Sequence, residues 1–145
     1  MNFISKRFNE LTTVELYEIL KSRTEIFLLE QRIICQDMDC KDYESLHCFF
    51  ADGNRIIAYL RAFCSGEGAV TIGRVLTLEH KKGLGSELMK KSIEGIKKEF
   101  NPEKIIVHAQ KQAVGFYEKM GFNSVSDEYL EEGIPHITME MSLGF

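Results

Sequence analysis

The hydrophobic pattern of the middle third of the chain has the period of β-strands. Residues 46–51 (LHCFFA) and 55–64 (RIIAYLRAFC) are rich in aromatic and β-branched residues, and Asp52-Gly53-Asn54 between them indicates a hairpin. A second turn at 65–68 leads into a third apolar segment at 69–78. These three segments predict an antiparallel meander.

Upstream of the meander the apolar positions have a helical period. Thr12 and Glu15 have the spacing of a capping box, which marks the start of a helix. The apolar residues that follow fit one helical face, which predicts a helix to about Glu30: Leu16, Ile19, Leu20, Ile26 and Phe27. Residues 2–8 favour a short strand before this helix, and the polar segment 31–45 favours a loop or a short helix.

Helical and strand patterns alternate in the last third of the chain. Apolar residues recur at helical spacing from Leu84 to Phe100, before Asn101-Pro102 ends the pattern. The remaining predicted elements are a buried strand at 104–109, a short helix at 112–119 ended by Gly121, and two strands near 122–129 and 137–142 flanking a loop at 131–136.

The resulting order is β-α-(α)-β-β-β-α-β-α-β-β, an antiparallel front that passes into a β-α-β unit. This order predicts an α/β fold (α+β, mixed sheet), in which a central, mostly antiparallel sheet is flanked by helices on both faces. A chain of 145 residues is expected to form a single domain, residues 1–145.

Charge and composition narrow the classes of function. A net charge of −4 argues against an extended nucleic-acid surface. No apolar run approaches the roughly 18 residues of a membrane span, and residues 1–10 lack the features of a secretory signal. We therefore expect a cytoplasmic protein with neither nucleic-acid nor membrane partners; a homodimer is left open.

The four cysteines were considered as zinc ligands. Cys35, Cys40 and Cys48 lie near His47, and Cys64 follows, but no C-x-x-C pair is present and the spacing is irregular. Reduced thiols without a metal are therefore the expectation.

The stretch HKKGLGSEL (80–88) lies between a predicted strand and a predicted helix. Glycines at a helix start let the backbone approach an anion, and Lys81 and Lys82 add positive charge. A tight turn with solvated lysines is the alternative. A Walker A loop does not fit, because the chain has no G-x-x-x-x-G-K-[ST] run. A dinucleotide fingerprint does not fit either, because Gly83-Leu84-Gly85 is followed by Leu88 rather than by a third glycine.

Several further motifs occur in a fixed order along almost the whole chain. Ala113 and Tyr117 lie four residues apart on one helical face, before Gly121-Phe122. The other motifs are Arg23, Phe27, Glu30-Gln31, 37–39, His47, Ile72-Gly73-Arg74-Val75, Ala109-Gln110, Phe116, Tyr129 and 133–137. Together with the glycine loop they resemble the GNAT family of acetyl-CoA-dependent N-acyltransferases, and within it the ElaA-like branch. His80 and Gln110 depart from the wider family, which usually has Gln or Arg at the first position and often Asn at the second.

The resemblance implies transfer of an acetyl group from acetyl-CoA to a primary amine, directly and within a ternary complex. It implies Tyr117 as the general acid beside the CoA sulfur. The residues expected to bind acetyl-CoA are Val75, Leu76, Thr77, Lys81, Lys82, Gly83, Leu84, Gly85, Ser86, Gln110 and Phe116.

The general base and the acceptor are less defined. An amine with a pKa near ~10.4 must lose a proton before it attacks, and Glu30, His47 and His136 are the candidates. Gln31, Asp39 and Arg74 are candidates for binding a small-molecule or peptide amine. Arg74 lies mid-strand and needs an acidic partner from residues 37–42. A non-catalytic CoA-binding regulatory module and a peptide-interaction module are the alternatives.

Overall fold

The computed structural model describes residues 1–78 and 83–144 and contains an eight-stranded sheet. Seven strands follow one another across the sheet: β1 (Asn2–Arg7), β2 (Leu46–Asp52), β3 (Arg55–Gly66), β4 (Ala69–Thr77), β5 (Lys104–Gln110), β8 (Ile134–Ser142) and β6 (Asn123–Ser124). β7 (Tyr129–Glu131) pairs with the other end of β8. All neighbouring pairs are antiparallel except β4 and β5, which are parallel. The prediction of a mixed, mostly antiparallel sheet is confirmed.

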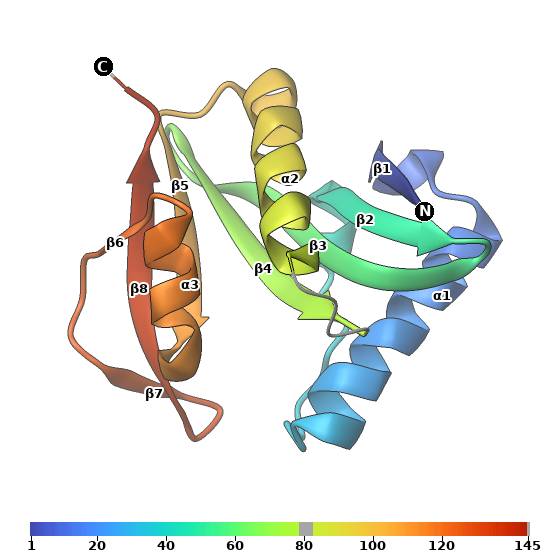
Figure 1. The fold of residues 1–145 in the computed structure, drawn as a ribbon, viewed down its shortest axis with the longest axis horizontal. Helices are drawn as coiled ribbons and strands as arrows, with labels where there is room; N and C mark the ends of the chain where they lie inside the picture. The colour runs from blue at the N-terminus through green and yellow to red at the C-terminus, as the bar shows by residue number, and fades with distance from the viewer. Residues whose placement is uncertain (79–82, 145) are drawn as a thin grey trace.

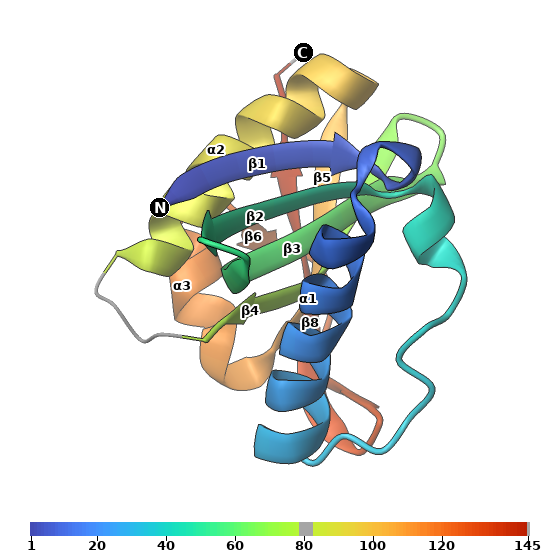
Figure 2. The same ribbon diagram turned by 90° about the vertical axis from the view of Figure 1, so that its right-hand side faces the viewer.

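Helices cover both faces of this sheet (Figures 1 and 2). One face carries α1 (Thr13–Arg23), which continues as the π-helical segment η2 (Thr24–Glu30). The other face carries α2 (Leu84–Phe100) and the short α3 (Val114–Lys119). Three single-turn 3-10 helices complete the described elements: η1 (Phe8–Glu10), η3 (Lys41–Glu44) and η4 (Lys111–Ala113).

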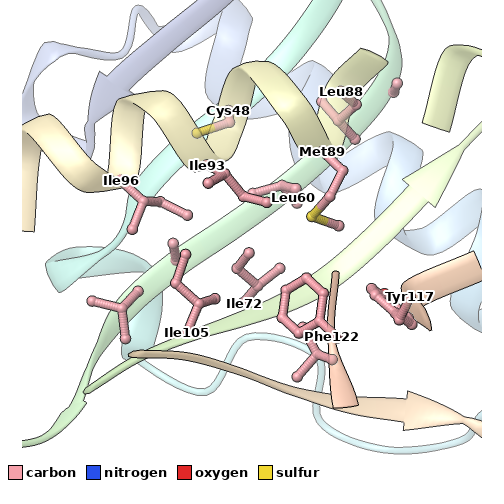
Figure 3. Close-up of a cluster of buried hydrophobic side chains, with 14 of the residues drawn as sticks. Cys48, Leu60, Ile72, Leu88, Met89, Ile93, Ile96, Ile105, Tyr117 and Phe122 are labelled. Carbon is pink, nitrogen blue, oxygen red and sulfur yellow. The ribbon is translucent and has the colours of Figure 1, made fainter. Parts of the chain in front are cut away.

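The core is correspondingly divided into two clusters. Beneath α2, the apolar stripe that includes Leu88, Ile93 and Ile96 packs on Leu60 and Ile72 of the sheet (Figure 3). Beneath α1, the second cluster is Ile19, Ile26, Phe49, Ile56, Tyr59 and Leu76. The alternation of side chains along each strand supplies both clusters from one sheet.

The first helix differs from its prediction in one respect. The capping box is present, because Thr12 Oγ1 accepts from Glu15 N at 3.0 Å and Glu15 Oε1 accepts from Thr12 N at 2.8 Å. The α-helix ends at Arg23, however, and the residues up to Glu30 form a wider π-helical turn. The hydroxyl of Thr24 donates to the carbonyl of Leu20 at 3.1 Å, and such side-chain bonds compete with the regular helical pattern.

The C-terminal elements also differ from their prediction. The strand expected at 122–129 is limited to the two residues of β6, and β7 follows at Tyr129. The expected loop at 131–136 is a two-residue turn, because Glu132 and Gly133 both have positive φ values, 51° and 73°, which suits a tight hairpin. Residues 134–136 therefore belong to β8 and are held in the sheet.

No helix in the described ranges is both long and apolar enough to cross a membrane.

Candidate active site

β4 and β5 separate halfway along their length, and this separation creates the site. Their parallel pairing runs from Ala69–Lys104 to Ile72–Val107 and then stops, although β4 continues to Thr77 and β5 to Gln110. The two strands visibly diverge in Figure 1. The edge of β4 that faces β5 therefore has no strand partner beyond Ile72, and its backbone groups are left for another ligand.

A bulge in β4 lies at the same place. Tyr59 of β3 pairs with Leu76, whereas Arg61 pairs with Gly73, so Arg74 and Val75 together oppose a single β3 residue. Arg74 has a φ of 53°, the left-handed region that side chains other than glycine rarely adopt. A bulge of this kind bends a strand and redirects its side chains, and it is common next to active sites.

A cavity of about 1150 Å³ lies at this separation, and the residues that line it come from both faces of the sheet. On the α2 side it reaches the start of α2 and the side chains of Phe116 and Tyr117. On the α1 side it lies between the segment after η2 and the β7–β8 hairpin. Thirteen predicted site residues line it: Gln31, Asp39, Arg74, Val75, Leu76, Thr77, Gly83, Gly85, Ser86, Gln110, Phe116, Tyr117 and His136.

The first turn of α2 opens onto the cavity. Gly83 is the N-cap and has a φ of 85°, which favours glycine. The first helical hydrogen bond joins Glu87 N to Gly83 O at 3.0 Å, so the three preceding amides have no helical partner. Gly85 and Ser86 line the cavity, whereas Leu84 is buried in the core and does not line it. Lys81 and Lys82 lie outside the described residues.

Tyr117 lines the same cavity. Its side chain is 6% exposed and packs edge-on against Phe116 and Phe122. Burial raises the pKa of its hydroxyl to about 12, so the phenol is protonated at neutral pH. Within residues 1–78 and 83–144 no hydrogen-bond partner of this hydroxyl is found. A buried hydroxyl of this kind is suited to donate to a bound ligand.

His136 faces the cavity from β8 and is held in one orientation. Its Nδ1 lies 2.7 Å from the carbonyl oxygen of Ile134, which can only accept, so Nδ1 carries a proton. In the neutral ring Nε2 therefore has the lone pair, and Nε2 lies 3.5 Å from a carboxylate oxygen of Glu131. The ring stacks on Tyr129 with 6.1 Å between centroids. These contacts hold the imidazole ring in one orientation.

His108 is a second cavity histidine, and the sequence analysis did not select it. It follows the last residue of β5 that pairs with β4, and its Nδ1 lies 3.0 Å from the Tyr129 hydroxyl and 3.1 Å from the Thr138 hydroxyl. The alternation of KIIVHAQ places His108 and Gln110 on one face, opposite Val107 and Ala109. This alternation is the feature of the sequence from which His108 could have been identified as a cavity residue.

Two of the predicted bases do not reach the cavity. His47 is completely buried, with Nδ1 2.7 Å from the Tyr59 hydroxyl and Nε2 2.9 Å from the Asp42 carbonyl oxygen. Burial lowers its pKa, so His47 is a neutral residue of the structure and its prediction as a cleft residue is wrong. Glu30 is exposed at the end of η2 and is not part of the cavity wall, so that placement is also corrected.

Arg74 has the acidic partners expected for it. Its Nε lies 2.9 Å from Asp37 Oδ1 and its Nη2 3.5 Å from Asp39 Oδ2. Asp37 also binds the buried Arg23 at 3.0 Å, and Asp39 binds Arg61 at 2.6 Å. The ion pairs fasten the segment after η2 to β3 and β4, so this part of the cavity wall is held by charge.

Asp42 is the most buried acid of this cluster, and its loss is expected to destabilise the fold. Burial opposes its ionisation, but hydrogen bonds from Arg23 at 2.7 Å and Arg61 at 3.1 Å hold its pKa below the ordinary value. Asp42→Asn should lower the free energy of unfolding at pH 7 by about 2–3 kcal/mol, because it leaves buried guanidinium groups under-compensated.

The effect should depend on pH. Because the folded-state pKa is lowered, the stabilisation is complete above the unfolded-state value of roughly 3.9 and is lost as the pH falls through the folded-state value. Denaturant unfolding of both proteins should therefore show a gap that narrows below about pH 4. Asp127→Asn, at an exposed position, is the control and should show no such gap. A gap that is constant with pH would contradict an ionised Asp42.

The cysteines do not gather around one point. Cys48 is buried and Cys35, Cys40 and Cys64 are exposed. In the part of the chain that the structure describes, no group of three or more His, Cys, Asp or Glu residues has the geometry to hold a metal ion.

Comparisons with known proteins give the same family. The acetyltransferase (GNAT) domain family matches residues 24–143. A UPF0039 protein of Schizosaccharomyces pombe is 36% identical over 99% of this chain and 98% of its own length. The crystal structure of Escherichia coli ElaA superposes with a TM-score of 0.92 at 30% identity, and an acyl-CoA N-acyltransferase from Pseudomonas aeruginosa with 0.92 at 32%; each comparison covers 98% of this chain and 100% of the other.

The matched family covers most of the chain, and the ElaA structure superposes over nearly all of it. The chain therefore belongs to the GNAT acetyltransferase family, in its ElaA-like branch.

Proposed function

We propose that this chain acts as one N-acetyltransferase domain that moves an acetyl group from acetyl-CoA to a primary amine in a ternary complex. The observation that carries this proposal is the cavity where β4 and β5 separate, with Tyr117 in its wall. Because residues from both faces of the sheet line this cavity, it can hold two substrates that approach from opposite sides of the sheet. The GNAT family membership supports the same class of reaction.

The residues present fit acetyl-CoA. The unpaired edge of β4 from Gly73 to Thr77 offers backbone donors and acceptors to an amide-containing arm. The first turn of α2, from Gly83 to Ser86, offers amides that precede the first helical hydrogen bond, and the positive end of a helix dipole, to phosphate groups. When bound, acetyl-CoA supplies an activated acetyl group as a thioester.

Two side chains of the protein then transfer protons. The Tyr117 hydroxyl donates to the leaving sulfur as negative charge develops there. His136 Nε2 accepts the proton that the ammonium of the acceptor must lose before attack, directly or through water. Of the three bases considered from the sequence, only His136 lines the cavity, so we propose it for this role.

A thiol-release assay tests the proposed function. Purified protein with acetyl-CoA and a panel of amines should release free CoA only when an accepted amine is present, and mass spectrometry should find the acetylated amine. Tight binding of acetyl-CoA without release for any amine, peptide or protein acceptor would favour the alternative, a CoA-binding regulatory or peptide-interaction module.

The start of α2 gives a further prediction. A Cβ at Gly85 would lie 3.6 Å from the Phe116 ring, an ordinary contact, so the fold should accept a side chain there. Because Gly85 lines the cavity, Gly85→Val should fill space needed by the ligand and weaken acetyl-CoA binding about tenfold or more in calorimetry.

Glu87→Val is the matched control for this change. Glu87 is exposed on the same helical turn, so the control introduces the same β-branched residue away from the cavity. Thermal unfolding of both variants should be similar. Equal affinity of Gly85→Val and the parent would remove the first turn of α2 from the acetyl-CoA site.

A further inference from the structure

The segment after η2 carries Asp37 and Asp39 on the α1 side of the cavity, but it has little negative charge to offer a ligand. Asp37 uses Oδ1 for Arg74 and Oδ2 for Arg23, at 2.9 and 3.0 Å. Both oxygens of Asp39 bind Arg61, at 2.8 and 2.6 Å. These carboxylates are therefore neutralised by guanidinium groups and are poorly placed to attract a cationic acceptor.

Cationic groups on the same wall keep unused donors. Arg74 binds the acids through Nε and Nη2 only, and no partner of its Nη1 is found among the described residues. Lys41 lines the cavity with its Nζ 5.0 Å from the centroid of the Phe63 ring, and no carboxylate lies within 4.0 Å of it in the described ranges. Both side chains line the same cavity wall, and their charge favours binding of an anionic group.

The backbone of Arg74 supports a role beyond the ion pairs. Its left-handed φ of 53° occurs within the bulge where β4 leaves β5. Such a conformation is unfavourable for a residue with a side chain, and it persists where the surroundings hold it. Here it places Arg74 in the cavity wall, beside the end of the β4–β5 pairing.

The opposite wall has the opposite charge. Glu131 and Glu132 line the cavity from the β7–β8 hairpin, beside His136. Glu131 is half exposed, and no basic partner other than His136 is found for it within the described residues. The cavity on this side of the sheet is thus polarised, with acids near the proposed base and available cations across from them.

We propose that the acceptor is a small dipolar amine, one that carries a carboxylate on the same molecule as its reactive amino group. Its carboxylate binds between Lys41 and Arg74, and its amine lies toward Glu131 and His136. Free amino acids and short peptides both have this chemistry. The proposal rests on the proposed acetyl transfer and names the class of its acceptor.

Matched pairs of acceptors test this proposal. Each amino acid is compared with its own amide, and with a dipeptide and the dipeptide amide, in the thiol-release assay. For the accepted members, kcat/KM should be about tenfold or more higher for the carboxylate form, the scale of a hydrogen-bonded ion pair. A preference shown by dipeptides and not by amino acids would identify a peptide C-terminus as the source of the carboxylate.

Variants assign the preference to the cation pair. Lys41→Gln should lower the acid-over-amide ratio of kcat/KM about tenfold, and Lys41→Glu should reverse it in favour of the amide. Lys98→Gln, which removes an exposed lysine of α2, is the matched control and should keep the parent ratio. A ratio near one in the parent, or a ratio unchanged by Lys41→Glu, would overturn the proposal.

If turnover is slow, a binding experiment tests whether the acceptor site prefers a carboxylate. CoA-saturated protein is titrated with N-acetyl amino acids and with their amides in a calorimeter, and the acids should bind about tenfold more tightly. Equal binding, or binding of neither, overturns the dipolar acceptor. Failure of the proposed function is distinct, since it would appear as no binding of acetyl-CoA or no acetylation of any amine.

Discussion

Tyr117→Phe is expected to lower kcat about 10²–10⁴-fold, the usual scale for one proton-transferring group. The change removes a single oxygen atom. The ring packs between Phe116 and Phe122, and these contacts are kept by phenylalanine. Because burial raises the pKa of the hydroxyl to about 12, the native group is a donor throughout the neutral range. Its loss should therefore leave the developing negative charge on sulfur without its donor.

Three measurements separate this role from a structural one. Acetyl-CoA affinity by calorimetry and the thermal unfolding midpoint should change little, since no partner of the hydroxyl is found among the described residues. The kcat of Phe122→Leu is the comparison for loss of ring packing, because Phe122 packs on Tyr117 and is not among the residues that line the cavity. A fall of kcat under about fivefold for Tyr117→Phe would return Tyr117 to a packing role, because a step other than protonation would then limit the rate.

The fold was predictable where the pattern is local. The capping box of Thr12 and Glu15, the apolar stripe of α2 and the meander of β2 to β4 are each contained in a short stretch. Period, turn residues and caps act within such stretches. The π-helical turn after Arg23 was not predicted, since its apolar positions fit a regular helix equally well.

The site was predictable only in part, because its geometry depends on contacts between distant segments. The strand LHCFFAD has apolar residues on both faces, so a side chain on either face is expected to be buried. The structural role of His47 follows from its hydrogen bonds with Tyr59 and Asp42, which the sequence does not show. From the sequence, the polar segment 31–45 was expected only to be a loop or a short helix. The structure shows instead that arginines from α1, β3 and β4 converge on it.

The separation of β4 from β5 is the feature least visible in the sequence. Both strands have apolar segments up to Ile72 and Val107, but a polar residue after such a segment does not by itself show that the pairing of the two strands ends there. Two further features depend on contacts between strands and are not visible in one segment. They are the bulge at Arg74 and the pairing of β5 with β8, which continues to Gln110. Only the resemblance to GNAT acetyltransferases connected these stretches to one site.

His136→Gln is expected to lower kcat/KM for the amine about 10²–10⁴-fold near neutral pH, the scale for loss of a general base. Glutamine keeps a similar length and can still hydrogen-bond, but it cannot take a proton at neutral pH. The loss should shrink as the pH rises toward ~10, because free amine then becomes abundant and needs no base. A residue that only anchors the acceptor would instead raise KM at every pH.

Two other variants make the pH–rate profile specific. His108→Gln alters the other cavity histidine, whose Nδ1 is engaged by Tyr129 and Thr138, and Glu30→Gln alters an exposed residue outside the cavity wall. For neither variant do we expect a loss of kcat/KM that shrinks as the pH rises. His47→Gln should mainly lower thermal stability, since both ring nitrogens of the buried side chain are hydrogen-bonded.

The decisive comparison is between the two cavity histidines, because they share the polar cluster around Tyr129. If His136→Gln keeps the parent pH profile and His108→Gln loses it, the base is His108, and the proton leaves through the Tyr129 and Thr138 side of the cluster. If both keep it, the ammonium loses its proton to water. Only a pH-dependent loss confined to His136→Gln supports Nε2 of His136, whose lone pair is fixed by the bond from Nδ1 to Ile134, as the proton acceptor.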